Sequence, residues 1–114
     1  MPKQDYYRAG QLTDVAYLVL LTLTVPRHGY LIMSKIEETT SGEVRIGPAS
    51  LYTTLRKLTE AELIRLTSEE DGKKVYHITE SGFSALQIEI EKRERYAKYG
   101  KRVMEEAMEG KLWN

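Results

Sequence analysis

A long stretch without proline lies near the C-terminal end of this chain and limits the folds open to it. From Glu80 to about Glu109 the only helix breakers are Gly82 and Gly100. At the rise of an α-helix, the stretch predicts a helix on the order of 45 Å long. The chain has 114 residues, which suffice for one compact domain with a modest core and hardly for two. We therefore expect one small domain with a helical extension that the domain cannot fully cover.

Three shorter helices are predicted before this stretch. Residues 15–25 are apolar nearly all round and end at Pro26, so they should form a helix at the centre of the domain. A second helix opens at His28 and the two residues after it, and the polar cluster 39–42 should end it. A third is expected from about Pro48 to Glu62, because leucines recur there at helical spacing.

The start of the third helix has a local cause. Gly47 tolerates unusual backbone angles, Pro48 fixes φ, and Ser50 can cap unpaired amides. With the leucines turned inward, the flanks and the outer side are rich in hydroxyls and cations. Taken alone, this pattern is also that of an ordinary amphipathic helix with a solvated face. The outer residues are Tyr52, Thr53, Thr54, Arg56, Lys57 and Glu60.

Residues 63–67 and 74–78 are two strand-like runs that flank a turn ending in Asp71-Gly72, which predicts a β-hairpin. Thr79 then caps the long final helix. The expected fold is mainly α with a small β-hairpin (α+β), a winged helix-turn-helix followed by a long C-terminal helix. We place the first domain at 1–79, including an N-terminal extension, and the dimerisation helix at 80–114. In such a fold the third helix enters the major groove of DNA and the hairpin lies over adjacent phosphates.

Several ordered motifs between about residues 12 and 82 resemble the PadR family of bacterial transcriptional regulators. They are Leu12-Thr13, Arg27-His28-Gly29-Tyr30, Gly47-Pro48-Ala49-Ser50-Leu51-Tyr52, Leu58, Glu62-Leu63-Ile64, Val75-Tyr76 and Ile78-Thr79-Glu80-Ser81-Gly82. The β-hairpin is the wing of such a fold. The single helix that follows the wing resembles that of the compact subfamily, in which this helix pairs with its counterpart in a homodimer. The resemblance implies a repressor that binds an inverted-repeat operator.

Candidate DNA-binding residues follow from these positions. Hydroxyls and cations of the third helix suit base edges and phosphates, because DNA presents acceptors. The resemblance implies that two tyrosines help to position the DNA backbone, and packing of their rings in the core is an alternative role. Two wing lysines can neutralise phosphates, although the acidic residues 69–71 oppose them. The candidates are Ser50, Thr53, Thr54 and Lys57, with Arg56 on the flank, then Tyr30 and Tyr52, and finally Lys73 and Lys74.

The final helix carries an apolar seam that predicts a partner helix. We expect its first half to pack on its own domain and its second half on the other subunit. The alternative, a solvent-facing helix in a monomer, leaves a large apolar patch exposed. The predicted dimerisation residues are Ile90, Ala97, Gly100, Val103, Met104 and Ala107.

The resemblance also implies that a small-molecule effector could regulate this protein. Some relatives bind planar drugs or phenolic compounds at the dimer centre, beside an aromatic residue of the last helix. This chain has Arg93 in that region, and its only tryptophan, Trp113, lies in the tail. Arg93 suits an anionic ligand, and core or interface packing is the alternative role for all the candidates. They are Tyr6, Tyr7, Arg93, Tyr96 and Tyr99.

Composition excludes several other functions. The absence of cysteine removes disulfides and thiolate chemistry, and two separated histidines do not make a metal site. No catalytic or nucleotide-binding motif is present, so we expect neither an enzyme nor a cofactor. The longest apolar run is too short for a bilayer, which favours a cytoplasmic protein. Because Lys+Arg (17) and Asp+Glu (17) balance, a winged-helix protein-interaction module with little DNA binding remains the alternative.

Overall fold

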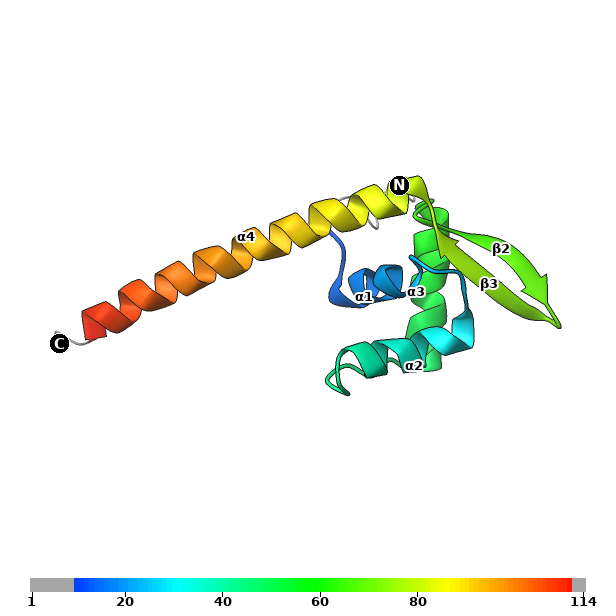
Figure 1. Ribbon diagram of the computed structural model, residues 1–114, viewed down its shortest axis with the longest axis horizontal. Helices are drawn as coiled ribbons and strands as arrows, with labels where there is room; N and C mark the ends of the chain where they lie inside the picture. The colour runs from blue at the N-terminus through cyan, green and yellow to red at the C-terminus, as the bar shows by residue number, and fades with distance from the viewer. Residues whose placement is uncertain (1–9, 112–114) are drawn as a thin grey trace.

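The computed structural model describes residues 10–111. Three helices form a compact unit, a small antiparallel sheet packs beside it, and one long helix extends away on the side opposite to the hairpin (Figure 1). This arrangement confirms the predicted fold, mainly α with a small β-hairpin. The elements are α1 (Asp14–Thr22), β1 (Arg27–His28), α2 (Gly29–Thr39), α3 (Pro48–Glu60), β2 (Ile64–Glu70), β3 (Lys73–Ile78) and α4 (Glu80–Lys111).

Several details differ from the sequence-based expectations. The two-residue strand β1 was not predicted; it pairs with β3, and the sheet order is β1-β3-β2. Helix α1 ends at Thr22 instead of continuing to Val25. The N-cap of α3 is Gly47, without a side-chain cap bond. Ser50 lies three residues further on, inside the helix, so its predicted capping role was wrong.

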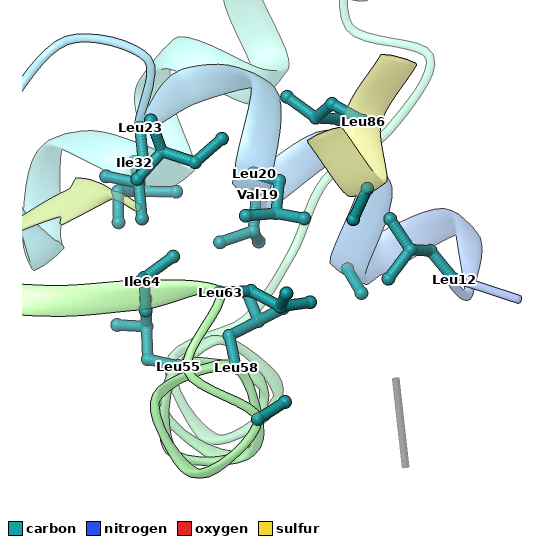
Figure 2. Packing of buried hydrophobic residues seen from close by; sticks show 14 of the residues in the cluster. Leu12, Val19, Leu20, Leu23, Ile32, Leu55, Leu58, Leu63, Ile64 and Leu86 are labelled. Carbon is teal, nitrogen blue, oxygen red and sulfur yellow. The ribbon is translucent and has the colours of Figure 1, made fainter. Parts of the chain in front are cut away.

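The core lies where the three helices, β2 and the start of α4 meet. Figure 2 shows Leu20 of α1, Ile32 of α2 and Leu58 of α3 among the buried side chains, and all three are fully buried. Leu86 of α4 belongs to the same cluster. The first turns of α4 are therefore part of the domain core, as expected for the first half of this helix.

The start of α4 is hydrogen-bonded to the segment between α3 and β2. Thr79 donates its N–H to the Leu63 carbonyl at 3.0 Å, and its hydroxyl donates to the Glu62 carbonyl at 2.7 Å. The same hydroxyl accepts from the Gly82 N–H at 3.0 Å, which confirms Thr79 as the helix cap. A Cβ atom added at Gly82 would lie 2.1 Å from the Leu63 carbonyl oxygen. Gly82 is therefore a close-packing position and not a helix breaker.

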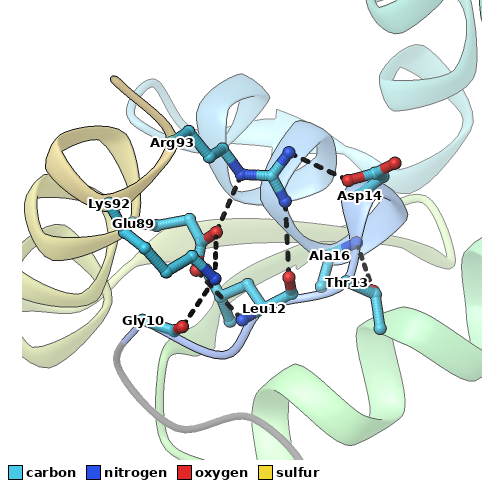
Figure 3. Close-up of polar contacts among 8 residues, drawn as sticks. All are labelled: Gly10, Leu12, Thr13, Asp14, Ala16, Glu89, Lys92 and Arg93. Carbon is cyan, nitrogen blue, oxygen red and sulfur yellow. Dashed lines mark hydrogen bonds and ion pairs between the residues drawn. The ribbon is translucent and has the colours of Figure 1, made fainter. Parts of the chain in front are cut away.

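Two turns further along α4, the buried Glu89 carboxylate joins this helix to the segment before α1 (Figure 3). Its Oε1 accepts the Leu12 N–H at 3.0 Å. Its Oε2 contacts Lys92 Nζ at 3.0 Å and Arg93 Nε at 2.8 Å. Lys92 also donates to the Gly10 carbonyl at 2.6 Å. We call this group, with Asp14, the Glu89 junction.

Arg93 completes the Glu89 junction. Its Nη1 donates to Asp14 Oδ1 at 2.8 Å, its Nη2 donates to the Leu12 carbonyl at 3.3 Å, and its guanidinium lies 4.3 Å from the Tyr17 ring centroid. Burial alone would raise the pKa of Glu89, but the Leu12 N–H, Lys92 and Arg93 outweigh it and lower that pKa. The carboxylate is therefore held in its charged form, and it fixes where α4 leaves the domain.

Replacing Gly82 by alanine should destabilise the fold, because the new methyl group collides with backbone at Leu63. We expect Gly82→Ala to lower the free energy of unfolding by about 2 kcal/mol in urea denaturation. The matched control is Gly110→Ala in the same helix, where an added Cβ meets nothing within 4 Å. Equal denaturation midpoints for wild type and Gly82→Ala would contradict this close packing.

The Glu89 junction makes a pH-dependent contribution to stability. The folded-state pKa of Glu89 lies below its ordinary value of 4.5, so its stabilisation is complete above that pH and is lost as the pH falls through the folded-state pKa. We expect Glu89→Gln to cost about 3 kcal/mol at neutral pH and progressively less in acid. Urea denaturation from pH 7 downward measures this difference at fixed protein concentration. Glu91→Gln, an exposed neighbour, is the control; a pH-independent loss for Glu89→Gln would exclude a role for its charge.

Candidate nucleic-acid interface

Helix α3 has a buried face and an exposed face. Leu51, Leu55 and Leu58 are at most 2% exposed. Thr54 is only 6% exposed on this same inner face, so its predicted contact with DNA is not retained. Of the remaining candidates on α3, Ser50, Tyr52, Thr53 and Arg56 are exposed and Lys57 is partly buried.

Four predicted DNA-binding residues line one cleft between the start of α2, α3 and the hairpin. The cleft has a volume of about 320 Å³ and contains Tyr30, Tyr52, Lys73 and Lys74 together with Tyr76. Lys73 Nζ lies 5.0 Å from the centroid of the Tyr30 ring. The fold thus brings residues from three separate segments into one surface of aromatic rings and cations.

The hairpin is attached to the start of α2 by further contacts around His28. The rings of His28 and Tyr30 stack with centroids 5.6 Å apart, and His28 Nε2 lies 4.0 Å from Glu70 Oε2. Tyr76 closes the inner side of the cleft, where burial and the neighbouring Tyr52 raise its pKa. These contacts hold the wing beside the N-terminal half of α3.

The wing carries positive and negative side chains on adjacent strands. Its turn is Asp71-Gly72, and both residues have positive φ, 51° and 75°, as in the favoured hairpin turns. Across the strands, Glu69 pairs with Lys74 and Glu70 with Lys73. Since a glutamate stands opposite each lysine in the strand register, the net attraction of the wing for phosphate is small, and α3 is the principal candidate for DNA contact.

Helix α4 continues beyond the domain with an apolar stripe. The face that buries Ala85 and Glu89 carries Tyr96, Gly100 and Val103 further along, at steps of three, four or seven residues. Of the predicted dimerisation residues, Ile90 is half-buried against its own domain. The others, exposed in the isolated chain, are Ala97, Gly100, Val103, Met104 and Ala107.

The predicted effector residues that the structure describes have different surroundings. Tyr6 and Tyr7 lie outside the described residues. Tyr96 and Tyr99 are 62% and 47% exposed. Arg93 is held inside the Glu89 junction by Glu89, Asp14 and Leu12, so its guanidinium does not offer an open anion site.

Sequence reasoning missed Glu89, Lys92 and Asp14 as a structural group. The spacing of Glu89, Lys92 and Arg93 was the available signal, because residues three and four apart on a helix are neighbours. Within residues 10–111 there is no group of three histidine, aspartate or glutamate side chains that could hold a metal ion. None of the helices described is long and apolar enough to cross a bilayer.

Comparison with known proteins agrees with this geometry. Residues 18–88 match the Transcriptional regulator PadR-like family. The chain is 37% identical over 87 residues to the transcriptional regulator YqjI of Escherichia coli strain K12, in an alignment covering 75% of this chain and 40% of that protein. The chain thus spans less than half the length of this curated relative.

Solved structures show the same fold. A transcriptional regulator from Clostridium thermocellum superposes with a TM-score of 0.71 at 23% identity, covering 77% of this chain and 90% of the other. Bacillus subtilis PadR, solved in complex with operator DNA, gives a TM-score of 0.60 at 27% identity, covering 68% of this chain and 46% of that chain.

Proposed function

The chain belongs to the PadR-like family of transcriptional regulators, a class of regulators and not of enzymes, and from that premise we propose that it is a homodimeric DNA-binding repressor. The observation that carries the proposal is the surface formed by α3 and the adjoining cleft. There Tyr52 lines one cleft with Lys73 and Lys74, and Arg56 lines a second cleft with Lys74. Thr53 is exposed on the same helix. Double-stranded DNA is the partner that such hydroxyls and cations suit.

In this proposal α3 enters the major groove and the wing lies over the neighbouring phosphates. Ser50 and Lys57 contact the DNA backbone on one side of α3, and Tyr30 and Tyr52 contact it from the cleft. Lys73 and Lys74 add short-range attraction to phosphate. Because the chain has a formal net charge of zero, binding depends on these local charges and should weaken with salt.

The exposed stripe of α4 supports a homodimer. A second copy would cover Gly100, Val103 and Met104, which otherwise leave apolar surface in water. Gly100 permits close approach of helices, because an added Cβ there would project into open space. A two-fold dimer presents two α3 helices to successive major grooves, which fits an inverted-repeat operator with half-sites about one helical turn apart.

Repression would follow from occupancy of an operator that overlaps a promoter. Release requires an effector that binds better to a dimer with the wrong spacing between its α3 helices. Tyr96 and Tyr99 lie beside the proposed interface and are the candidates for contact with such a ligand. The chemistry proposed for DNA binding uses only side chains and calls for no cofactor.

Charge reversal on α3 distinguishes this function from a winged-helix protein-interaction module. Lys57→Glu should weaken binding to a specific duplex by roughly tenfold or more and should flatten its salt dependence, because a phosphate contact is replaced by repulsion. Fluorescence anisotropy across a salt series, with DNA from upstream of its own gene and other genomic fragments, measures both effects. Lys98→Glu on α4 supplies the same charge change away from α3. A wild-type protein without salt-linked DNA binding would favour the interaction module.

A charge in the stripe of α4 should separate the subunits. Val103→Glu places a carboxylate where we propose that another helix packs, so the species of twice 13.1 kDa should dissociate at micromolar concentration. Sedimentation equilibrium measures the mass, and Lys98→Glu on the opposite face of α4 should leave it unchanged. A dimer that survives both substitutions would place the interface elsewhere.

A further inference from the structure

We infer that the base-reading stripe of α3 consists of Ala49, Thr53 and Arg56, and that it recognises thymine methyl groups next to a guanine. The inference rests on the proposed DNA-binding function and names the bases that this helix would select. It also changes the part assigned to Arg56, which the sequence places on the flank of the helix.

The outer side of α3 has a central stripe with a flank on either side of it. Positions 49, 53, 56 and 60 follow each other at steps of four, three and four residues, so they lie on one stripe of the helix. This stripe is opposite the buried Leu51, Leu55 and Leu58. Ala49 and Thr53 are exposed, and the Arg56 side chain is 64% exposed. The first three positions of the stripe are therefore exposed on the side of α3 opposite the core, whereas Glu60 is partly buried.

Small side chains at the first two positions decide what this stripe can contact. Ala49 presents one methyl group, and Thr53 presents a methyl and a hydroxyl. Side chains this short let the helix backbone approach the base edges closely. In the major groove only thymine offers an apolar group, its 5-methyl, and alanine and threonine methyls are the side-chain groups that suit it.

Arg56 follows one turn after Thr53 and reaches further. Its Nη1 lies 4.0 Å from Glu60 Oε1, a loose i,i+4 pair that directs the side chain along the stripe. A guanidinium pairs with both acceptors of guanine, O6 and N7. Ser50, Lys57 and Tyr52 lie on the flanks, so they face the phosphates that border the groove.

The test begins with selection of preferred duplexes from a random DNA pool by the wild-type protein. Each thymine of the selected half-site is then replaced singly by deoxyuridine, which removes only the 5-methyl group. We expect about a fourfold loss of affinity at each contacted thymine, the value of one buried methyl group. At the thymine that Thr53 contacts, Thr53→Ser should show that loss on the thymine duplex and no further loss with deoxyuridine, whereas Thr53→Val should keep the deoxyuridine effect.

Two further variants complete the design. Arg56→Ala should relax the preference for one guanine by roughly tenfold or more. Ser50→Ala, on the flank, should weaken all duplexes alike and keep the deoxyuridine effect. Thermal melting confirms that each variant is folded.

The outcomes separate this inference from the function on which it rests. Selected half-sites without thymine, or wild-type affinity unchanged by deoxyuridine at every position, would overturn the inference while DNA recognition stands. Failure to select any duplex over random DNA would overturn the proposed function as well. A deoxyuridine effect that persists at every thymine in the double variant Ala49→Gly, Thr53→Ser would assign the thymine contacts to other residues.

Discussion

The buried carboxylate of Glu89 joins two segments that lie far apart in the sequence, the turn before α1 and the third turn of α4. A charged group without solvent is costly unless it is paired and hydrogen-bonded. Leu12, Lys92 and Arg93 supply those partners, and Arg93 also forms an ion pair with Asp14. Together with the close contact of Gly82 at Leu63, the Glu89 junction sets the direction in which α4 leaves the domain. In the proposed dimer that direction also sets the distance between the two α3 helices, so a small change at the junction would be magnified along the helix.

The proposed DNA surface has a different organisation, because it depends on elements that pack side by side. β1 pairs with β3, His28 stacks on Tyr30, and Lys73 lies over the Tyr30 ring. These contacts bring the wing against the start of α2 and next to α3. A chain without net charge can then gather cations at one place, while carboxylates on the opposite strand limit attraction to unrelated anions. Weak long-range attraction and specific short-range contacts would favour selection between DNA sequences over general affinity for DNA.

Much of the fold could be predicted, because the sequence marks helix starts and hydrophobic spacing locally. Gly47-Pro48, Thr79 and Asp71-Gly72 act within a few residues of their own positions. The strand β1 was missed because two residues carry no periodic signal and its pairing with β3 is a tertiary contact. Thr54 was misplaced because its hydroxyl suggested a polar surface, whereas its position between Leu51, Leu55 and Leu58 puts it inside. Glu89 was missed because a glutamate within a charged helix is ordinarily exposed, and only the packed structure shows its partners. The second half of α4 is exposed in the single chain, and in the proposed dimer its cover is a second subunit, a contact that the local sequence signals of one chain do not encode.

In the proposed dimer, α4 joins two copies so that two α3 helices meet DNA one helical turn apart. The most direct measurement compares binding to duplexes in which two selected half-sites are about 10 bp or about 15 bp apart, centre to centre. The longer spacing places the second half-site on the opposite side of the duplex without changing either half-site. A dimer held by α4 should bind tightly at the shorter spacing, and at the longer spacing with an affinity near that for a single half-site. Equal affinity at both spacings would contradict a rigid dimer held by α4.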